Sequence, residues 1–316
     1  MKNTKNVRRK KWKRKDFELS VIALPTFVWY LAFSYLPMFG VVIAFKEYKR
    51  VIPKGSFLKN LIASEWVGFK NFQFIFKSND FFILLRNTLG YNLIFIVLGT
   101  AIPVAMAIAM SMMYSSRKAK VYQTMLFFPH FMSWVVVGYF THSFLSYDRG
   151  LLNSIITFFG GEPIQWYMEK DYWPFILVFV ALWKSVGYGM VVYLASITGI
   201  DQTLYEAAVV DGANKKQQIK YITLPCLKKV IVMMLILRVG GIFCSDFGLF
   251  YHISKGAQGS IFSTTATIDT YIYNALAGSP IGMTSAVSVL QSVTACVTIL
   301  AANWIVSKID EESAII

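Results

Sequence analysis

The sequence has few acidic residues and few residues of the kinds that bind metals. Its 316 residues include 17 Asp and Glu against 31 Lys and Arg, with three His and three Cys. Cys226, Cys244 and Cys296 are widely spaced and form no C-x-x-C motif, so we expect small buried apolar side chains rather than a disulfide or metal framework. The histidines show no H-E-x-x-H spacing, and we expect no bound metal.

The chain also lacks motifs for nucleotide hydrolysis and for enzymatic catalysis. No G-x-x-x-x-G-K-[ST] loop is present to hold ATP phosphates, so we expect no nucleotide cofactor on this chain. A polytopic membrane enzyme is a weak alternative, because the loop acids are scattered: Asp148, Glu162, Glu169 and Asp171. A stand-alone secondary transporter is another alternative, although the inverted repeats that such transporters usually show are not evident.

Apolar residues dominate the chain instead. They make up 56% of it, and mean hydropathy is +0.51, which predicts an all-α polytopic membrane protein. A bilayer-spanning helix needs about 20 apolar residues. Six stretches qualify, at 19–45, 82–113, 121–145, 173–197, 227–251 and 284–306. We therefore predict a basic tail at 1–16, a six-helix transmembrane domain at 17–309 and a short tail at 310–316.

The distribution of positive charge predicts the orientation. Net charge is +14, and nine of the positive residues lie in the first fifteen positions with no acid among them. A basic tail before an apolar helix is read as a cytoplasmic orientation signal that faces anionic lipid, rather than as a nucleic-acid site. Six spans then place both termini in the cytoplasm. The basic stretch 46–80 is the weakest point of this topology. The predicted topology places it on the extracellular side, where positive charge is not expected.

The stretch 206–225, EAAVVDGANKKQQIKYITLP, is a polar island between two apolar runs. Thr203 and Glu206 have the spacing of a capping box at a helix start. Gly212 suits the left-handed end of that helix, and Asn214 with Gln217 suits the cap of a second one. Pro225 suits the first turn of the next long helix. The pattern predicts a helix–turn–helix elbow outside the membrane.

This stretch closely resembles the "EAA" coupling loop of permease subunits of type I ATP-binding-cassette (ABC) importers. The resemblance implies that the loop, here 201–225, docks on a separate cytoplasmic ATPase dimer that carries ATP and Mg. An ordinary cytoplasmic loop is the alternative. Ile219 stands where relatives often have Phe. The matching residues are Glu206, Ala207, Ala208, Asp211, Gly212, Ala213, Leu224 and Pro225.

Further motifs resemble the carbohydrate-uptake branch of that family, the LplB- and MalF-like oligo- and polysaccharide permeases. They lie at 128–136 and 182–187, and a G-x-x-N-F segment lies at 68–72. The resemblance implies the type I permease fold in a bacterial cell membrane, a second, non-identical permease subunit, an extracellular substrate-binding protein and a saccharide substrate. The loop 146–173 is then an external cap that the binding protein touches.

Three ionisable residues fall inside predicted spans: Lys184, Arg238 and Asp246. Helical spacing predicts that Lys184 shares a face with Tyr188, and that Arg238 shares one with Ser245 and Asp246. An intramembrane charge is unfavourable by several kcal/mol unless it is paired or faces water. The resemblance implies that they line the substrate path together with Trp183, Tyr188 and Ser245. Lys184 and Arg238 against Asp246 leave an excess of positive charge in the path, which favours an acidic sugar as the substrate. The alternative is that the charges pair with each other and touch no substrate.

Overall fold

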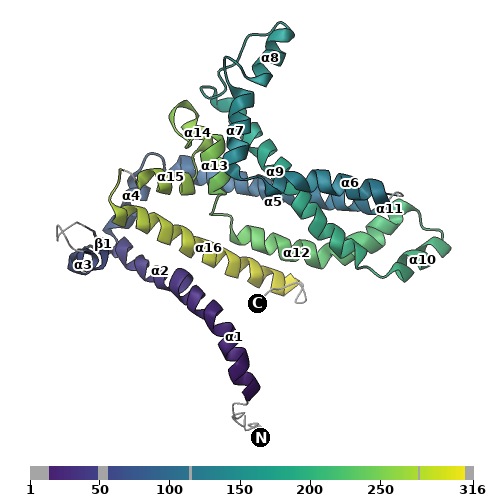
Figure 1. Ribbon diagram of the computed structural model, residues 1–316, viewed down its shortest axis with the longest axis horizontal. Helices are drawn as coiled ribbons and strands as arrows, with labels where there is room; N and C mark the ends of the chain where they lie inside the picture. The colour runs from purple at the N-terminus through teal and green to yellow at the C-terminus, as the bar shows by residue number, and fades with distance from the viewer. Residues whose placement is uncertain (1–13, 49–55, 114–115, 277, 310–316) are drawn as a thin grey trace.

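The computed structural model describes residues 14–48, 56–113, 116–276 and 278–309, and most of them lie in helices (Figure 1). The predicted tail 310–316 lies outside the described residues, as does the predicted basic tail up to residue 13. Within the described ranges, the one strand pair is short and antiparallel, joining β1 (Lys46–Glu47) to β2 (Glu65–Trp66). The expected helical class is confirmed for this part of the chain.

Four helical segments are long and apolar enough to cross a bilayer, and they match the first, second, fourth and sixth predicted spans. They cover Lys15–Phe45, Phe81–Ser111, Lys170–Thr198 and Ile281–Lys308. Their elements are α1 (Arg14–Tyr30), η1 (Leu31–Tyr35), α2 (Leu36–Met38) and η2 (Phe39–Phe45), then α5 (Phe81–Ser111), then η5 (Lys170–Tyr172) and α9 (Trp173–Thr198), and finally α16 (Ile281–Ile309).

The third predicted span, 121–145, is not one straight helix. Its two halves are α6 (Ser116–Phe127) and α7 (Trp134–Leu145), and the chain bends by 96° between them. Pro129 lies in the turn that joins them, and the Ser133 hydroxyl caps α7. A proline followed by a capping serine ends one helix and starts another. The two halves together make at most a fifth span in the described residues.

The fifth predicted span, 227–251, is also divided. Helix α12 (Leu224–Gly240) ends at a glycine pair, and α13 (Phe247–Ile253) starts only after the irregular stretch 241–246. Asp246 begins α13 as its N-cap. The prediction that Arg238 and Asp246 share one helical face is therefore wrong, because the helix ends between them. Single helices of the described residues do not reach the predicted number of six spans.

Helices α5 and α9 run side by side at the centre of the molecule (Figure 1). One buried cluster joins Val104 and Ala107 of α5 to Met190 and Tyr193 of α9 and to Leu227 of α12. Lipid is as apolar as these side chains, so close packing rather than the hydrophobic effect holds such helices together. The C-terminal ends of α5 and α9 therefore lie at the same end of the molecule.

Gly187 permits the close approach of α6 to α9. A Cβ added there would lie 1.9 Å from the carbonyl oxygen of Leu126 on α6. We expect Gly187→Ala to push the helices apart and to lower the free energy of unfolding by about 1–3 kcal/mol. Gly90→Ala is the control, because its Cβ meets nothing within 4 Å. Thermal melting in detergent tests this, and equal melting temperatures for the two variants would contradict it.

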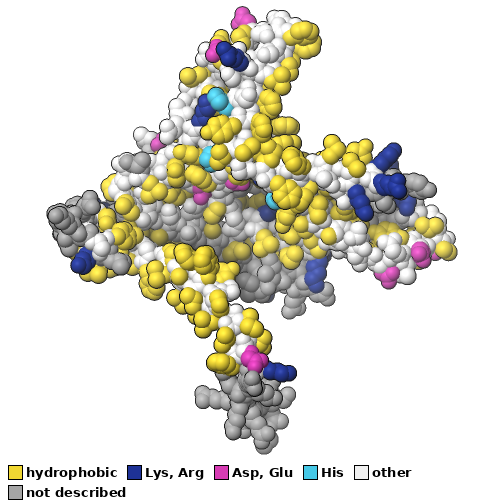
Figure 2. All heavy atoms as spheres, viewed as in Figure 1, with side chains coloured by type: hydrophobic (Ala, Val, Ile, Leu, Met, Phe, Trp, Pro, Cys, Tyr) yellow, Lys and Arg dark blue, Asp and Glu magenta, His cyan; other side chains and the backbone are white. Residues whose placement is uncertain are grey.

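Helix α1 of the first span projects away from the other helices (Figure 1), whereas η2, at the end of that span, packs against α16. Only 6% of the span's most apolar window is buried within the chain. Figure 2 shows apolar side chains along its exposed length. Its concave side forms a groove lined by residues such as Ile22, Phe27, Tyr30 and Tyr35. This apolar surface is left for lipid or for another subunit.

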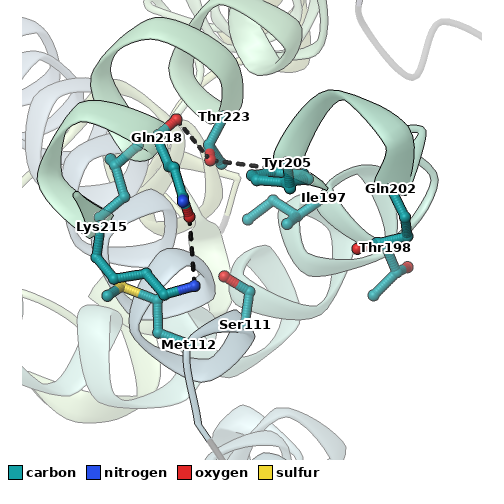
Figure 3. Close-up of a pocket in the computed structure, with 10 residues that line it drawn as sticks. Ser111, Met112, Ile197, Thr198, Gln202, Tyr205, Lys215, Gln218 and Thr223 are labelled. Atoms are coloured by element: carbon teal, nitrogen blue, oxygen red, sulfur yellow. Dashed lines mark hydrogen bonds between the residues drawn. The ribbon is translucent and has the colours of Figure 1, made fainter. Parts of the chain in front are cut away.

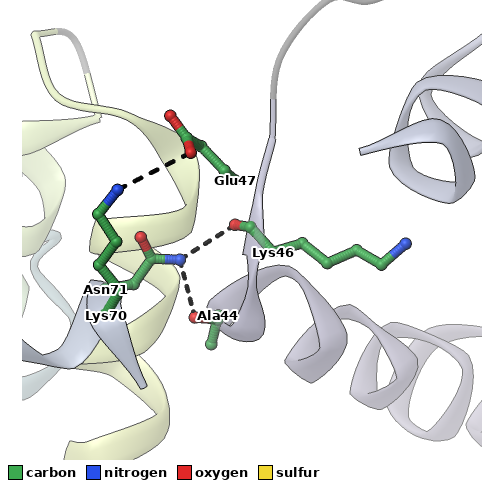
Figure 4. A network of polar contacts seen from close by, with 5 residues as sticks. All are labelled: Ala44, Lys46, Glu47, Lys70 and Asn71. Atoms are coloured by element: carbon green, nitrogen blue, oxygen red, sulfur yellow. Dashed lines mark hydrogen bonds and ion pairs between the residues drawn. The ribbon is translucent and has the colours of Figure 1, made fainter. Parts of the chain in front are cut away.

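The G-x-x-N-F segment anchors the end of the first span. The buried Asn71 amide donates to the carbonyl oxygens of Ala44 at 2.9 Å and Lys46 at 3.0 Å (Figure 4). Lys70 lies 4.0 Å from the Glu47 carboxylate in the same network. Asn71 thus ties residues 44–46 to the segment before α5. The expectation that this segment lies flat at the outer interface stays a prediction.

The predicted external cap carries α8 (Leu151–Phe158), which projects from one end of α7 (Figure 1). Asn153 folds this loop: its amide donates to the Ile164 carbonyl at 2.9 Å, and its oxygen accepts from the Ile164 N–H and the Trp166 indole. Contact with a binding protein stays a prediction. The remaining short elements are α3 (Phe57–Ala63), η3 (Lys70–Phe72), α4 (Gln73–Lys77), η4 (Phe128–Phe131), η7 (Gly259–Ile261), α14 (Phe262–Thr265) and α15 (Ile268–Ala275).

Candidate coupling and translocation site

The first helix of the elbow is α10 (Gln202–Val210), and it starts differently from the prediction. Asp201, not Thr203, is the N-cap, and its carboxylate accepts a hydrogen bond from the Thr203 N–H at 3.0 Å. This bond holds the pKa of the exposed Asp201 carboxyl below its usual range. Glu206 therefore lies in the middle of α10 rather than in a capping box, and its side chain is exposed.

The turn of the elbow has the predicted geometry. Gly212 has φ +78°, and the Ala213 N–H donates to the Ala208 carbonyl at 2.8 Å, which closes α10 in a Schellman-type end. Asn214 and Gln217 then form a reciprocal capping box at the start of α11 (Lys215–Gln218). Local hydrogen bonds therefore hold α10 and α11 at a defined angle.

The elbow is fixed to the ends of the membrane helices. The Tyr205 hydroxyl lies 3.0 Å from that of Thr223, in η6 (Ile219–Thr223), which leads directly into α12 (Figure 3). Ser111 at the end of α5 and Thr198 at the end of α9 line the same pocket, of about 240 Å³. The elbow therefore lies at the ends of α5 and α9 and is hydrogen-bonded to the segment that begins α12.

The outer surface of the elbow is largely exposed in this chain. Glu206, Ala207, Asp211 and Gly212 are exposed, Ala208 and Ala213 are half-buried, and the exposed fraction of Val210 is 88%. Figure 2 shows acidic side chains over α10 and basic ones over the neighbouring ends of α6 and α11. Leu204 and Val209 of α10 are also exposed, and exposed apolar side chains grouped among polar ones are typical of an interaction surface.

A second group of predicted site residues meets at the bend between α6 and α7. Lys184 and Tyr188 share a face of α9, as predicted, and both touch His130. The Lys184 ammonium donates to the His130 carbonyl at 2.9 Å, and the Tyr188 ring stacks on the His130 ring at 4.7 Å. Trp183 is exposed on the neighbouring face of α9 and takes no part in these contacts among described residues.

Trp134 joins Lys184 to Asp246. The Lys184 ammonium lies 5.0 Å from the centre of the Trp134 ring, and the Trp134 indole donates to Asp246 at 3.0 Å. No ion pair within 4.0 Å links Asp246 to Lys184 or Arg238 among the residues that the structure describes. The charges thus do not neutralise one another directly. Trp134 and His130 were not predicted site residues.

Arg238 is placed on the opposite side of the irregular stretch from Asp246. Its guanidinium donates to the Phe95 carbonyl of α5 at 3.3 Å. Gly99 makes room for it, since a Cβ there would lie 2.8 Å from the Arg238 Nη1. Arg238 is exposed, so most of its five N–H donors are available to another molecule.

The irregular stretch 241–246 is held by three side chains that we call the break clamp: Asn92, Asp269 and Gln291. The Asn92 amide donates to the carbonyls of Ile242 and Cys244, and Gln291 donates to that of Phe243. Asp269 accepts from the N–H and the hydroxyl of Ser245, at 2.6 and 2.7 Å. Non-helical backbone inside a membrane protein needs such partners. The break clamp was not predicted.

The cysteines and histidines form no metal site in the described part of the chain. The expectation that the cysteines are buried is wrong: Cys226, Cys244 and Cys296 are free and exposed within this chain.

Comparison with known proteins identifies the family. Residues 101–310 match the family described as "Binding-protein-dependent transport system inner membrane component". The polygalacturonan/rhamnogalacturonan transport system permease protein YteP of Bacillus subtilis (strain 168) is 34% identical over 295 residues, 93% of this chain and 89% of that protein. Protein LplB of the same organism is 33% identical over 300 residues, 95% and 91% of the two chains.

The fold agrees with a solved permease structure. A chain of a bacterial ABC transporter involved in the import of the acidic polysaccharide alginate matches with a TM-score of 0.83 and 31% identity, over 94% of this chain and 97% of that one. These matches confirm the resemblance and a multi-pass bacterial membrane location. The chain belongs to the family of inner membrane components of binding-protein-dependent transport systems, among the sugar ABC transporter permeases.

Proposed function

We propose that this chain is the permease subunit of an ATP-driven importer of an acidic oligo- or polysaccharide. It works with a second, non-identical permease, a separate cytoplasmic ATPase dimer and an extracellular binding protein, and both of its termini are cytoplasmic. One observation carries the proposal: an exposed elbow, 201–225, lines one pocket together with the ends of α5 and α9 and is hydrogen-bonded to η6, which leads into α12. The elbow is the handle through which the ATPase moves the helices.

The elbow suits this role because it is stiff internally and open on its surface. Gly212 and the Asn214–Gln217 box fix the angle between α10 and α11. The contact of Tyr205 with Thr223 transmits displacement of α10 to the start of α12. A partner that binds inward- and outward-facing states with different affinity shifts the equilibrium between them. ATP-dependent closure of the ATPase dimer supplies that difference.

The substrate path is the second part of the proposal. The sequence predicts an excess of positive charge in the path. The structure adds a second carboxylate, Asp269, beside Ser245, so the two cationic and two anionic side chains balance in number. The unused hydrogen-bond donors and acceptors of these side chains do not balance. Asp246 and Asp269 each accept at least two hydrogen bonds from neutral groups, whereas Lys184 makes one such bond to His130. The unused groups are therefore cationic donors.

Two related transporters point to the same chemistry. YteP is named for polygalacturonan and rhamnogalacturonan, and the transporter of known structure imports the acidic polysaccharide alginate. Polygalacturonan is a polymer of a uronic acid. Carboxylates of such sugars would meet the free N–H groups of Lys184 and Arg238, and Arg binds carboxylates in a bidentate manner. Exposed Tyr188 and Trp183 supply faces for the sugar rings.

Uptake into proteoliposomes containing the complete importer tests this function. We expect ATP-dependent import of a uronate oligosaccharide, and Lys184→Met to reduce it by about tenfold or more, because a hydrogen bond to a charged group is lost. Lys184→Arg, which keeps the charge, should retain most of the uptake. Import of neutral oligosaccharides with acidic ones ignored would contradict acid specificity. Uptake driven by an ion gradient without the ATPase would indicate a secondary transporter instead.

A further inference from the structure

A pocket that contains a cationic side chain lies between α7 and α13, away from Lys184. It has a volume of about 270 Å³ and is lined by Tyr139 and His142 of α7, Tyr251 and His252 of α13, and Lys255 in the following turn. No Asp or Glu lines it. Figure 2 shows His side chains beside Lys and Arg side chains on this arm of the molecule, which also carries the predicted external cap.

Lys255 occupies a backbone position that favours glycine. It has φ +55° just after the end of α13, where the Gly256 N–H donates to the Tyr251 carbonyl at 2.7 Å and closes the helix. A residue with a side chain in this left-handed conformation is strained, and such strain gathers at functional sites. Glycine would form the same turn without strain. The presence of lysine here therefore points to a role for its side chain rather than for its backbone conformation.

The Lys255 ammonium is held in place by neutral groups. It lies 3.0 Å from His142 Nε2 and 4.9 Å from the centre of the Tyr167 ring. An ammonium group has no acceptor, so it donates to Nε2, and the proton of neutral His142 is on Nδ1. Lys255 makes no ion pair within 4.0 Å in the described part of the chain. Its positive charge and two of its N–H donors remain available.

His142 also carries an unused polar group. Its Nδ1 is buried and has no hydrogen-bond partner among the described residues. Because Nδ1 is buried, this ring acts at the pocket through Nε2, which accepts from Lys255. A carboxylate, an acceptor with two oxygens, matches an ammonium held in place by a neutral imidazole. Exposed Tyr139 and half-buried Tyr251 supply flanking aromatic rings.

We propose that this pocket binds the carboxylate of a uronate unit of the substrate, with Lys255 as the binding cation and His142 as the residue that positions it. The proposal rests on the proposed function and deepens it, because it adds a substrate contact on the arm of α7 and α13. Tyr139 and Tyr251 pack against the sugar ring. The pocket selects for acidic substrates before they reach the Lys184 region.

Lys255→Gly is the decisive variant, because it removes both the cation and the backbone strain. We expect its melting temperature in the intact importer to equal or exceed that of the wild type. We expect its KM for import of a uronate trisaccharide to rise by about tenfold or more. Lys255→Arg should keep a KM close to that of the wild type. A uronate KM that is unchanged in Lys255→Gly would overturn the proposal.

Calorimetric titration separates this proposal from the proposed function. Purified wild-type importer should bind the uronate trisaccharide, and Lys255→Gly should bind it about tenfold more weakly. Equal binding by the two proteins, or binding of inorganic phosphate in preference to the uronate, overturns the pocket assignment. If the wild type binds the uronate through Lys255 but does not import it with ATP, the proposed function fails while the pocket assignment stands.

Discussion

Replacing Glu206 by lysine is expected to abolish ATP-driven uptake while the chain still inserts in the membrane. Glu206 is exposed in the middle of α10, beside Ala207 and one turn before Val210. In the proposed assembly its carboxylate pairs with a cation of the ATPase. A lysine there opposes two like charges at a contact surface, which is unfavourable by several kcal/mol, or more than about 100-fold in affinity.

Gln202→Lys is the control, because it introduces the same lysine side chain one turn earlier on the same helix. Glu206→Gln removes the charge without adding a repulsion and should show an intermediate loss. The measurements are uptake into proteoliposomes and recovery of the ATPase in a pull-down of the tagged permease. Normal coupled transport by Glu206→Lys, with the ATPase still bound, would rule out docking through this side chain.

The elbow was predictable because its geometry is local. The left-handed turn at Gly212 and the capping box of Asn214 and Gln217 need only neighbouring residues, and the structure has both. The N-terminal cap was misplaced for the same local reason. Asp201 and Thr203 are both good caps, and the choice between them depends on where α9 ends, which is a property of packing rather than of capping chemistry.

The long spans were predictable from length and hydropathy, but the two breaks were not. Apolar residues continue through 128–133 and 241–246, so a hydropathy window registers no interruption there. Pro129 and the Gly240–Gly241 pair were the available signals. A proline or glycine in a membrane helix is often accommodated without a break. The outcome here depends on partners such as Asn92 and Gln291, which are distant in sequence.

The candidate path was only partly predictable for the same reason. Lys184 and Tyr188 are four residues apart on a true helix, so their common face was correct. Asp246 was assigned to a helix that ends before it, and its actual partner, Trp134, comes from a helix that the bend at Pro129 redirects. Contacts between residues that are distant in sequence decide which intramembrane charges meet. Such contacts cannot be predicted from a single sequence.

Asp269→Ala is expected to give the other large effect, because Asp269 is the charged member of the break clamp. Its carboxylate accepts from the Ser245 N–H, the Ser245 hydroxyl and the Gln291 amide, at 2.6, 2.7 and 3.1 Å. Alanine leaves the Ser245 N–H without a partner, whereas the Ser245 hydroxyl keeps Thr267 and the Gln291 amide keeps the Phe243 carbonyl. An unpaired donor is unfavourable by about 1–3 kcal/mol, and a hydrogen bond to a charged group contributes about 1.5–3 kcal/mol. We expect a clear drop in melting temperature in detergent and uptake reduced by about tenfold or more.

The loss of uptake follows from position, since residues 241–246 connect α12, which the elbow moves in the proposed mechanism, to α13, whose N-cap is Asp246. With the stretch released, movement of α12 no longer reaches Asp246 and Trp134. Asp269→Asn keeps one acceptor oxygen for Ser245 and should be affected less than Asp269→Ala. Asp171→Ala, at an exposed acid of the loop before α9, should behave as wild type. An Asp269→Ala importer with wild-type melting and uptake would show that the stretch holds its shape without the carboxylate, and that the two amides of the break clamp suffice.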